Sequence, residues 1–282
     1  MEKITRHQTD INFMNKQTIK AKQLVDTIYE GLTVSHNSSS LRMLSSLVQG
    51  YAGYLSVSFP ESVEICESIQ LAAKSAAALF ALASTSESEL EIYLSKDTSI
   101  RLPAKVDHSG VNCSAWCSGY YLAVICRDLP VLDNLCRIPL ELLRRSSTRY
   151  DEFTYSYISA LQSYWQGKDD AADHLIAAMT NAKPDKLHFC SEEYLYLKAI
   201  SQMELLFNLM RKDEEAFNKS LYIALECHHE LCDLDDETRL DSRLFLAYDL
   251  LALASLAHEQ GMTVRVESDY LPLSIVQGKC AV

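Results

Sequence analysis

The chain has 282 residues, 48% of them apolar, so it is long enough to bury a large core. Its formal net charge of -12 argues against a nucleic-acid-binding protein, because contact with phosphates needs clustered Lys and Arg. With 8 Gly and 6 Pro the chain lacks the frequent turns of an all-β protein, so we expect mostly helix. An acidic surface suits a basic protein partner better than a nucleic acid.

The cysteines and the N-terminus indicate the compartment. Nine Cys is an odd number, and Cys66, Cys126 and Cys227 stand inside apolar helical runs rather than at spaced loop positions. We therefore expect reduced, buried thiols. The first residues show no export signal, and no later segment is predicted to be long and apolar enough to cross a membrane. The expected location is the cytoplasm.

Three helices are predicted in the N-terminal part of the chain, where apolar side chains recur at helical spacing between polar breaks. Asp10 is placed to cap the first helix. The Ala-rich second half of the third helix allows another helix to approach closely. The predicted ranges are 10–34, 41–55 and 60–84, within an N-terminal helical region over 10–84.

The pattern then changes from helical to alternating over about residues 89–103. Leu90 and Ile92 alternate with polar residues, and Ile100 and Leu102 follow a polar turn, which predicts a β-hairpin. The run 264–267 alternates in the same way. The sheet is therefore predicted either as the hairpin alone or as a three-stranded sheet that this run completes.

The most apolar stretch is 244–257, in which only Asp249 and Ser255 are polar. A helix that is apolar all round must be covered on every side, and this one is too short to cross a bilayer. We predict a buried central helix ended by Gly261, with the Ala-rich half of the third helix as its partner. A C-terminal strand and turn over 263–272 are predicted to follow.

The region 112–261 is predicted to form helical hairpins. Turns at 164–172 and 209–216 each carry Lys-Asp with Ala three residues later, and the first resembles a tetratricopeptide unit. The predicted fold is therefore mainly α, a multi-helix array of antiparallel helix pairs, partly tetratricopeptide-like, with the small hairpin or sheet. We treat 1–282 as a single domain.

The run 227–229, Cys-His-His, with Cys232 suggests a zinc site, because thiolates and imidazoles ligate zinc. Neighbouring helical residues point about 100° apart and no second pair completes four ligands, so core packing is the simpler interpretation. No catalytic or cofactor motif is recognised. We predict no catalytic residue, metal or cofactor; an enzyme with a pocket around His228 or Cys113 is an alternative.

Two blocks of sequence resemble the immunity protein 49 family of bacterial polymorphic-toxin systems. One is the Ala-rich run 75–83 followed by the strand at 89–94, and the more specific one is 254–261 running into 264–272. The resemblance implies a helical, cytoplasmic, non-enzymatic protein that protects its producer by stoichiometric occlusion of a cognate secreted toxin. Toxins of such systems are often nucleases or other nucleic-acid-modifying enzymes, whose basic clefts an acidic inhibitor suits.

The predicted toxin-binding residues lie in the acidic segment 233–241, which lacks the Gly and terminal Glu of a calcium loop, and in the turn after the last strand. The alternative for Tyr270 is that it packs on the core. A tetratricopeptide-like scaffold for a peptide or regulatory protein is the competing function, and neither nucleic acid nor membrane is expected as a partner. The predicted residues are Asp233, Asp235, Asp236, Glu237, Asp241, Glu267, Asp269 and Tyr270.

Overall fold

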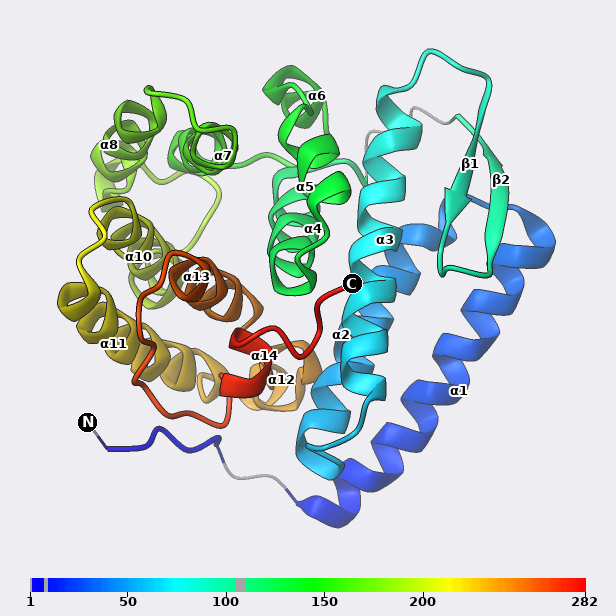
Figure 1. The fold of residues 1–282 in the computed structure, drawn as a ribbon, viewed down its shortest axis with the longest axis horizontal. Coiled ribbons are helices and arrows are strands. Elements are labelled where there is room, and N and C mark those ends of the chain that lie inside the picture. The colour runs from blue at the N-terminus through cyan, green and yellow to red at the C-terminus, as the bar shows by residue number, and fades with distance from the viewer. Residues whose placement is uncertain (1, 8–9, 105–109) are drawn as a thin grey trace. The chain divides into compact units, whose positions relative to one another are not determined.

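The computed structural model describes residues 2–7, 10–104 and 110–282 (Figure 1). Two compact units share the chain, and each is described by itself. Unit 1 comprises Met1–His7, Arg149–Asp241 and Leu246–Lys279, and unit 2 comprises Gln8–Thr148, Ser242–Phe245 and Cys280–Val282. Helices dominate both units, and the hairpin is the only sheet in the described ranges, which confirms the predicted mainly α class with a small hairpin.

Unit 2 is built on a row of helices in which α2 packs against both α1 and α3, and α3 packs against α4 (Figure 1). Asp10 caps α1 as predicted, accepting hydrogen bonds from the N–H groups of Asn12 and Phe13. The helices are α1 Ile11–Ser35, α2 Ser40–Ser58, α3 Glu64–Ser84, α4 Cys113–Cys126, α5 Leu129–Cys136, α6 Leu140–Arg144 and the 3-10 turn η3 Ser242–Leu244.

Helix α3 corrects one expectation, because it is long and apolar enough to cross a membrane by length and composition alone. More than half of its most apolar window is buried inside the protein, against α2 and α4. A helix in the core of a folded unit can be equally long and apolar. The apolar character of α3 is therefore explained by its packing inside unit 2.

The predicted hairpin is confirmed as β1 Glu89–Tyr93 and β2 Ser99–Pro103, paired antiparallel with Leu90 opposite Leu102 and Ile92 opposite Ile100. The predicted third strand is wrong. Residues 263–267 form no strand and lie on helix α11 (Glu214–Cys232), where the buried Asn218 amide accepts from Arg265 N–H at 2.7 Å and donates to the Thr263 carbonyl at 2.9 Å. The Asn218 side chain thus binds the backbone groups that a neighbouring strand would otherwise bind.

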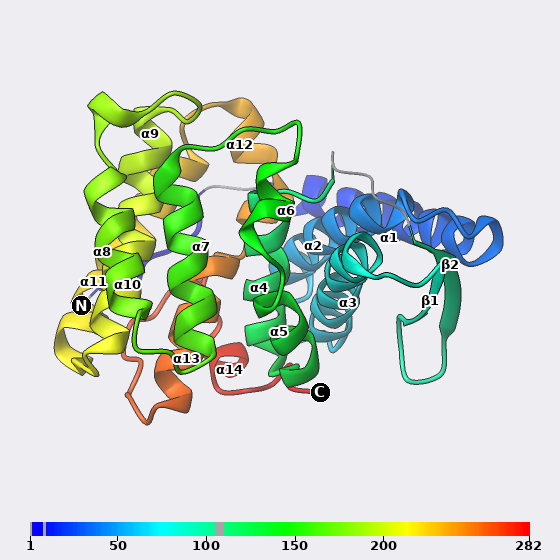
Figure 2. The ribbon, with the colours of Figure 1, turned by 90° about the horizontal axis from the view of Figure 1, so that it is seen from above.

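Unit 1 contains both predicted helical hairpins, the pairs α7/α8 and α10/α11, which run alongside one another (Figure 2). Left-handed residues, Gly167 and Lys212, close the two turns. The elements are α7 Glu152–Trp165, α8 Ala171–Asn181, η1 Pro184–Lys186, α9 Glu192–Tyr194, the π-turn η2 Leu195–Ala199, α10 Ile200–Met210, α11, α12 Asp236–Leu240, α13 Tyr248–Glu259 and α14 Leu273–Val276.

The central helix is shorter than predicted, because α13 begins at Tyr248 rather than at residue 244. Before it, Ala247 N–H donates to the Tyr270 carbonyl at 3.1 Å instead of to a preceding turn. Every residue from Tyr248 to Ala257 is buried, as predicted. Within unit 1, α13 packs against α10, α11 and α14, and the predicted partner α3 belongs to unit 2, where it packs against α2 and α4.

The expectation of reduced thiols fails for Cys66, which forms a disulfide with Cys280 across 214 residues of sequence. Both residues belong to unit 2, where the Gln70 amide also donates to the Cys280 carbonyl at 3.1 Å and so holds the C-terminal segment on α3. The other seven cysteines are free thiols.

Candidate functional site

The N-terminal segment joins the two halves of the predicted binding surface in unit 1. Residues 3–7 run beside 267–270: Ile4 N–H donates to the Glu267 carbonyl at 3.0 Å, and Asp269 N–H donates to the Ile4 carbonyl at 3.2 Å. Sequence reasoning missed this contact, because the two segments lie at opposite ends of the chain and a single bridge leaves no alternating pattern.

His7 connects this turn with the acidic segment. Its Nε2 lies 3.0 Å from the Arg239 carbonyl and its Nδ1 lies 2.9 Å from the Tyr270 hydroxyl. Because a carbonyl only accepts, Nε2–H donates to Arg239 and Nδ1 accepts from Tyr270. Burial lowers the pKa of His7, so the neutral ring is the stable form.

Most of the predicted carboxylates are already engaged within unit 1. Asp233 and Asp236 each pair with Arg239 at 2.8 Å, and Asp235 caps α12 in a capping box with Thr238. The bonds to Arg239 lower the pKa of Asp233. The acidic segment is therefore a short, self-paired helix rather than the open loop that was expected.

Asp269 is half-buried and bound by cations. Lys3 Nζ lies 2.6 Å from it, and the Arg6 N–H donates to it at 3.1 Å. Burial alone would raise the pKa of this carboxyl, but Lys3 and Arg6 outweigh burial and hold the pKa below its usual range. Its charge is largely neutralised, which makes it a weak candidate for direct contact.

The remaining predicted residues divide into exposed and buried ones. The side chains of Glu237 and Glu267 are exposed and make no hydrogen bond or ion pair within the described ranges, whereas Asp241 is half-buried. Tyr270 is completely buried, with the His228 ring 4.8 Å away, so its side chain packs inside unit 1. This matches the alternative that it packs on the core.

Apolar side chains flank the exposed carboxylates. Leu234, which precedes α12, is 46% exposed, and Leu240, the last residue of α12, is 50% exposed. Large exposed apolar groups beside unpaired charges are typical of protein interfaces, where apolar contact supplies affinity and charge supplies orientation. Within 233–241 the structure thus offers Leu234, Glu237 and Leu240 for contact.

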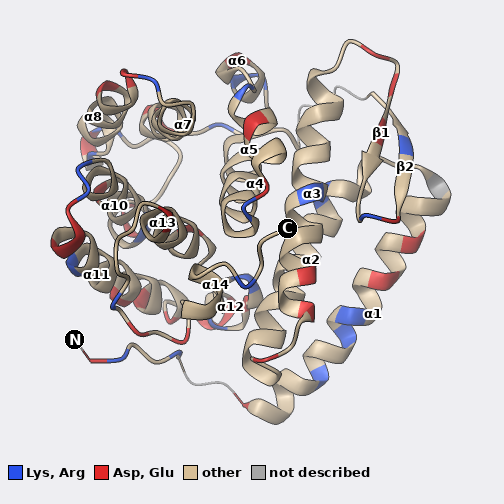
Figure 3. Cartoon of the chain, in the orientation of Figure 1, with Lys and Arg blue, Asp and Glu red and all other residues tan. Residues whose placement is uncertain are grey.

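The two units differ sharply in charge. Unit 1 carries 24 Asp and Glu against 13 Lys and Arg, whereas unit 2 carries 14 against 13. Nearly the whole net charge therefore belongs to unit 1, and Figure 3 shows its acidic residues along α11 and the neighbouring segments. A field of one sign attracts an oppositely charged partner and raises its rate of association.

Sequence reasoning also missed Asp151, which precedes α7. Its carboxylate accepts from the N–H groups of His188, Phe189 and Cys190 at 2.7, 3.2 and 2.9 Å. Burial raises the pKa of Asp151, but these three bonds outweigh it and leave the pKa below its usual range. The loop they hold presents Phe189, which is 60% exposed.

The polar residue inside the central helix has a structural role. Buried Asp249 accepts from the Gln202 amide at 2.5 Å and lies 3.5 Å from Lys198 Nζ, next to the π-turn. Burial would raise its pKa, but Lys198, His228 and Gln202 lower it below its usual range. Nowhere in residues 2–7, 10–104 and 110–282 do three or more His, Cys, Asp or Glu side chains converge as metal ligands.

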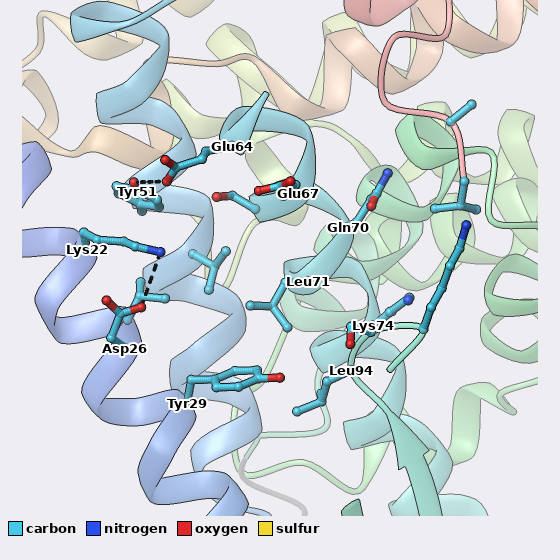
Figure 4. Close-up of a pocket in the computed structure, with 17 residues that line it drawn as sticks. Lys22, Asp26, Tyr29, Tyr51, Glu64, Glu67, Gln70, Leu71, Lys74 and Leu94 are labelled. Atoms are coloured by element: carbon cyan, nitrogen blue, oxygen red, sulfur yellow. Dashed lines mark hydrogen bonds and ion pairs between the residues drawn. The ribbon is translucent and has the colours of Figure 1, made fainter. Parts of the chain in front are cut away.

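Unit 2 contains a separate cavity of about 640 Å³ between α1 and α3 (Figure 4). Tyr51 lies at one side, with its hydroxyl donating to Glu64 at 2.5 Å. The Lys22 ammonium lies 5.6 Å above the Tyr51 ring and 3.4 Å from Asp26. Burial and the bond to Glu64 raise the pKa of the Tyr51 hydroxyl far above neutral, so it stays protonated.

Comparison with known proteins identifies the family. The family model described as immunity protein 49 matches residues 59–275, which include parts of both units. No curated protein and no solved structure matches the chain. Members of such families bind a toxin protein and in general are not enzymes. The match covers well over half of the chain, and the protein therefore belongs to the immunity protein 49 family of immunity proteins.

Proposed function

We propose that this immunity protein neutralises its toxin by stoichiometric occlusion in the cytoplasm, and that unit 1 carries the main contact surface. The observation that carries the proposal is the concentration of net negative charge in unit 1, together with the exposed Leu234, Glu237 and Leu240. A toxin that acts on nucleic acid needs a basic cleft, and an acidic surface complements such a cleft.

The predicted tetratricopeptide-like character supports this proposal, since stacked helix pairs present extended surfaces to protein partners. We further propose that units 1 and 2 together make up the single immunity domain. The family match, which includes parts of both, supports that view.

The test uses the toxin domain encoded next to this gene. The triple variant Asp236→Lys, Glu237→Lys and Glu267→Lys reverses exposed charges of unit 1 and spares the cap residue Asp235. We expect the affinity for the toxin to fall at least tenfold at low salt, the salt dependence to flatten, and growth rescue to weaken.

The matched control reverses three exposed carboxylates of unit 2, with Glu87→Lys, Asp97→Lys and Glu141→Lys. Both triple variants change the net charge equally, so a loss confined to the first locates the contact in unit 1. Equal affinity of the wild type and the first variant overturns the surface assignment. A wild-type protein that neither binds the toxin nor rescues growth overturns the function.

A further inference from the structure

A continuous groove runs along unit 2, and the surface proposed above makes no use of it. Two adjoining cavities, of about 640 and 850 Å³, share Lys22, Tyr51 and Glu64 and so form one groove. Helix α2 is the floor, because it packs against both α1 and α3. Figure 4 shows α1 and α3 as the two walls, with Tyr29, Glu67 and Leu71 pointing into the space between them.

Each wall contributes a stripe of side chains at helical spacing. On α3 the stripe runs from Glu64 through Leu71 to Lys74, and on α1 it runs from Thr18 to Tyr29. Ten helical residues rise about 15 Å, so the groove accommodates roughly three turns of another helix. Two helices on a shared floor form the kind of groove in which an amphipathic helix binds as a third neighbour.

Apolar side chains recur along the groove between its charged residues. Ile19 and Phe59 are 62% and 53% exposed, and Val25, Leu71 and Leu94 continue the apolar lining toward the hairpin. An aromatic and a branched aliphatic side chain, exposed together beside a groove, are typical anchor points of an interface.

Charge along the groove has a direction. Glu61, Glu64 and Glu67 line the end where α3 begins, whereas Lys74 and Lys96 line the end near the hairpin. Neither the Glu67 carboxylate nor the Lys74 ammonium has a hydrogen bond or ion pair within the described part of the chain. An occupant is therefore complementary in one orientation only, with its basic end at Glu67 and its acidic end at Lys74.

We propose that this groove binds an amphipathic helix of the cognate toxin domain, with apolar side chains on Ile19, Phe59 and Leu71, a basic end against Glu64 and Glu67, and an acidic end against Lys74. The inference rests on the proposed function and adds a second, apolar contact to the acidic one. Unit 1 then contributes attraction over distance, and the groove contributes the buried contact that slows dissociation.

The first experiment places a charge on the apolar anchor. Ile19→Asp is compared with Val34→Asp, which changes an 80% exposed residue of the same helix outside the groove. Isothermal titration with the neighbouring toxin domain should show at least a tenfold loss of affinity for Ile19→Asp and less than a twofold change for Val34→Asp. Circular dichroism checks that both variants fold.

The second experiment exchanges the negative and the positive end of the groove and leaves the net charge of the protein unchanged. The double variant Glu67→Lys/Lys74→Glu has the net charge of the wild type, so a tenfold loss of affinity reports the orientation of the occupant. Wild-type affinity in both the double variant and Ile19→Asp overturns the groove proposal, and it leaves the proposed function intact because the toxin still binds.

A second copy of the chain is the competing occupant. If sedimentation shows a dimer that Ile19→Asp dissociates while toxin affinity is unchanged, the groove is a self-association surface and the proposal is wrong. If the wild type does not bind the toxin at all, the proposed function fails first, so the two failures are distinguishable.

Discussion

His7 and Tyr270, 263 residues apart, exchange two hydrogen bonds: the His7 backbone N–H donates to the tyrosine oxygen at 3.1 Å, and the hydroxyl donates to His7 Nδ1 at 2.9 Å. The pair holds the N-terminal segment against the turn that follows residue 267. Because His7 Nε2 also binds the Arg239 carbonyl, one imidazole orients both segments of the predicted toxin-binding surface.

Stability should decline below neutral pH because of this pair. Burial of the His7 ring in this contact lowers the pKa of His7, and the nearby Arg6 guanidinium adds to that effect. The unfolded chain takes up the proton near pH 6.5, while the folded chain resists it. The stabilising contribution is complete above pH 6.5 and is lost as the pH falls through the lower folded pKa.

Replacing His7 tests this directly. His7→Phe keeps an aromatic ring but removes the side-chain donor to the Arg239 carbonyl and one partner of the Tyr270 hydroxyl, so we expect a loss of about 1–3 kcal/mol in the free energy of unfolding at pH 7.5. Urea unfolding at pH 7.5, 6.5 and 5.5 should also show a flatter decline than in the wild type. His258→Gln, at an exposed position of α13, is the control; an unchanged slope in His7→Phe would refute the assignment.

The buried Asp249 network should behave as a unit. Asp249→Leu removes the acceptor of the Gln202 amide and the carboxylate that lies beside Lys198, and we expect a loss of roughly 3 kcal/mol. The double variant Asp249→Leu/Lys198→Met should recover at least about 1 kcal/mol of that loss in a double-mutant cycle. Strict additivity of the two substitutions would show that the lysine and the aspartate do not interact.

The parts of the fold that the sequence predicts are those with local causes. Helical spacing located α1, α2 and the pairs α7/α8 and α10/α11, and alternation located the hairpin, because in each case the hydrogen-bond partners lie within a few residues. The errors fall where the partner is distant. Ala247 donates to Tyr270, and the segment 263–267 binds Asn218, so neither continues the local pattern.

The candidate site was predicted in part, for the same reason. Charge density alone found the acidic segment, but it could not show that Arg239 neutralises Asp233 and Asp236 or that Asp235 is a helix cap. Those roles depend on a five-residue helix whose capping box is visible only in its geometry. The groove in unit 2 was not predicted, since its lining comes from three helices, the hairpin turn and the last two residues, which lie far apart in the sequence.

The Cys66–Cys280 disulfide should stabilise the protein under oxidising conditions. Closing a loop of 214 residues restricts the unfolded chain. On the chain-entropy model this raises the free energy of unfolding by about 5 kcal/mol. Cys280→Ser should therefore lower the melting temperature without reductant and change little in its presence. Thiol titration of the unfolded protein should find seven reactive groups in the oxidised wild type; nine would show that the bond is absent.

Gly53 on α2 permits the close approach of the turn η3. A Cβ at this position would lie 1.8 Å from the Ser242 carbonyl oxygen, which is backbone and cannot turn aside. Gly53→Ala should therefore displace η3 and lower the free energy of unfolding by several kcal/mol, more than the about 1–3 kcal/mol of an ordinary overpacked core site.

Gly31→Ala is the matched control. Gly31 lies on the neighbouring helix α1, and a Cβ there meets nothing within 4 Å. Alanine is the better helix former, so Gly31→Ala should stabilise the protein by about 0.5–1 kcal/mol. Thermal unfolding of both variants measures the contrast, and equal effects of the two substitutions would show that α2 and η3 are not in close contact.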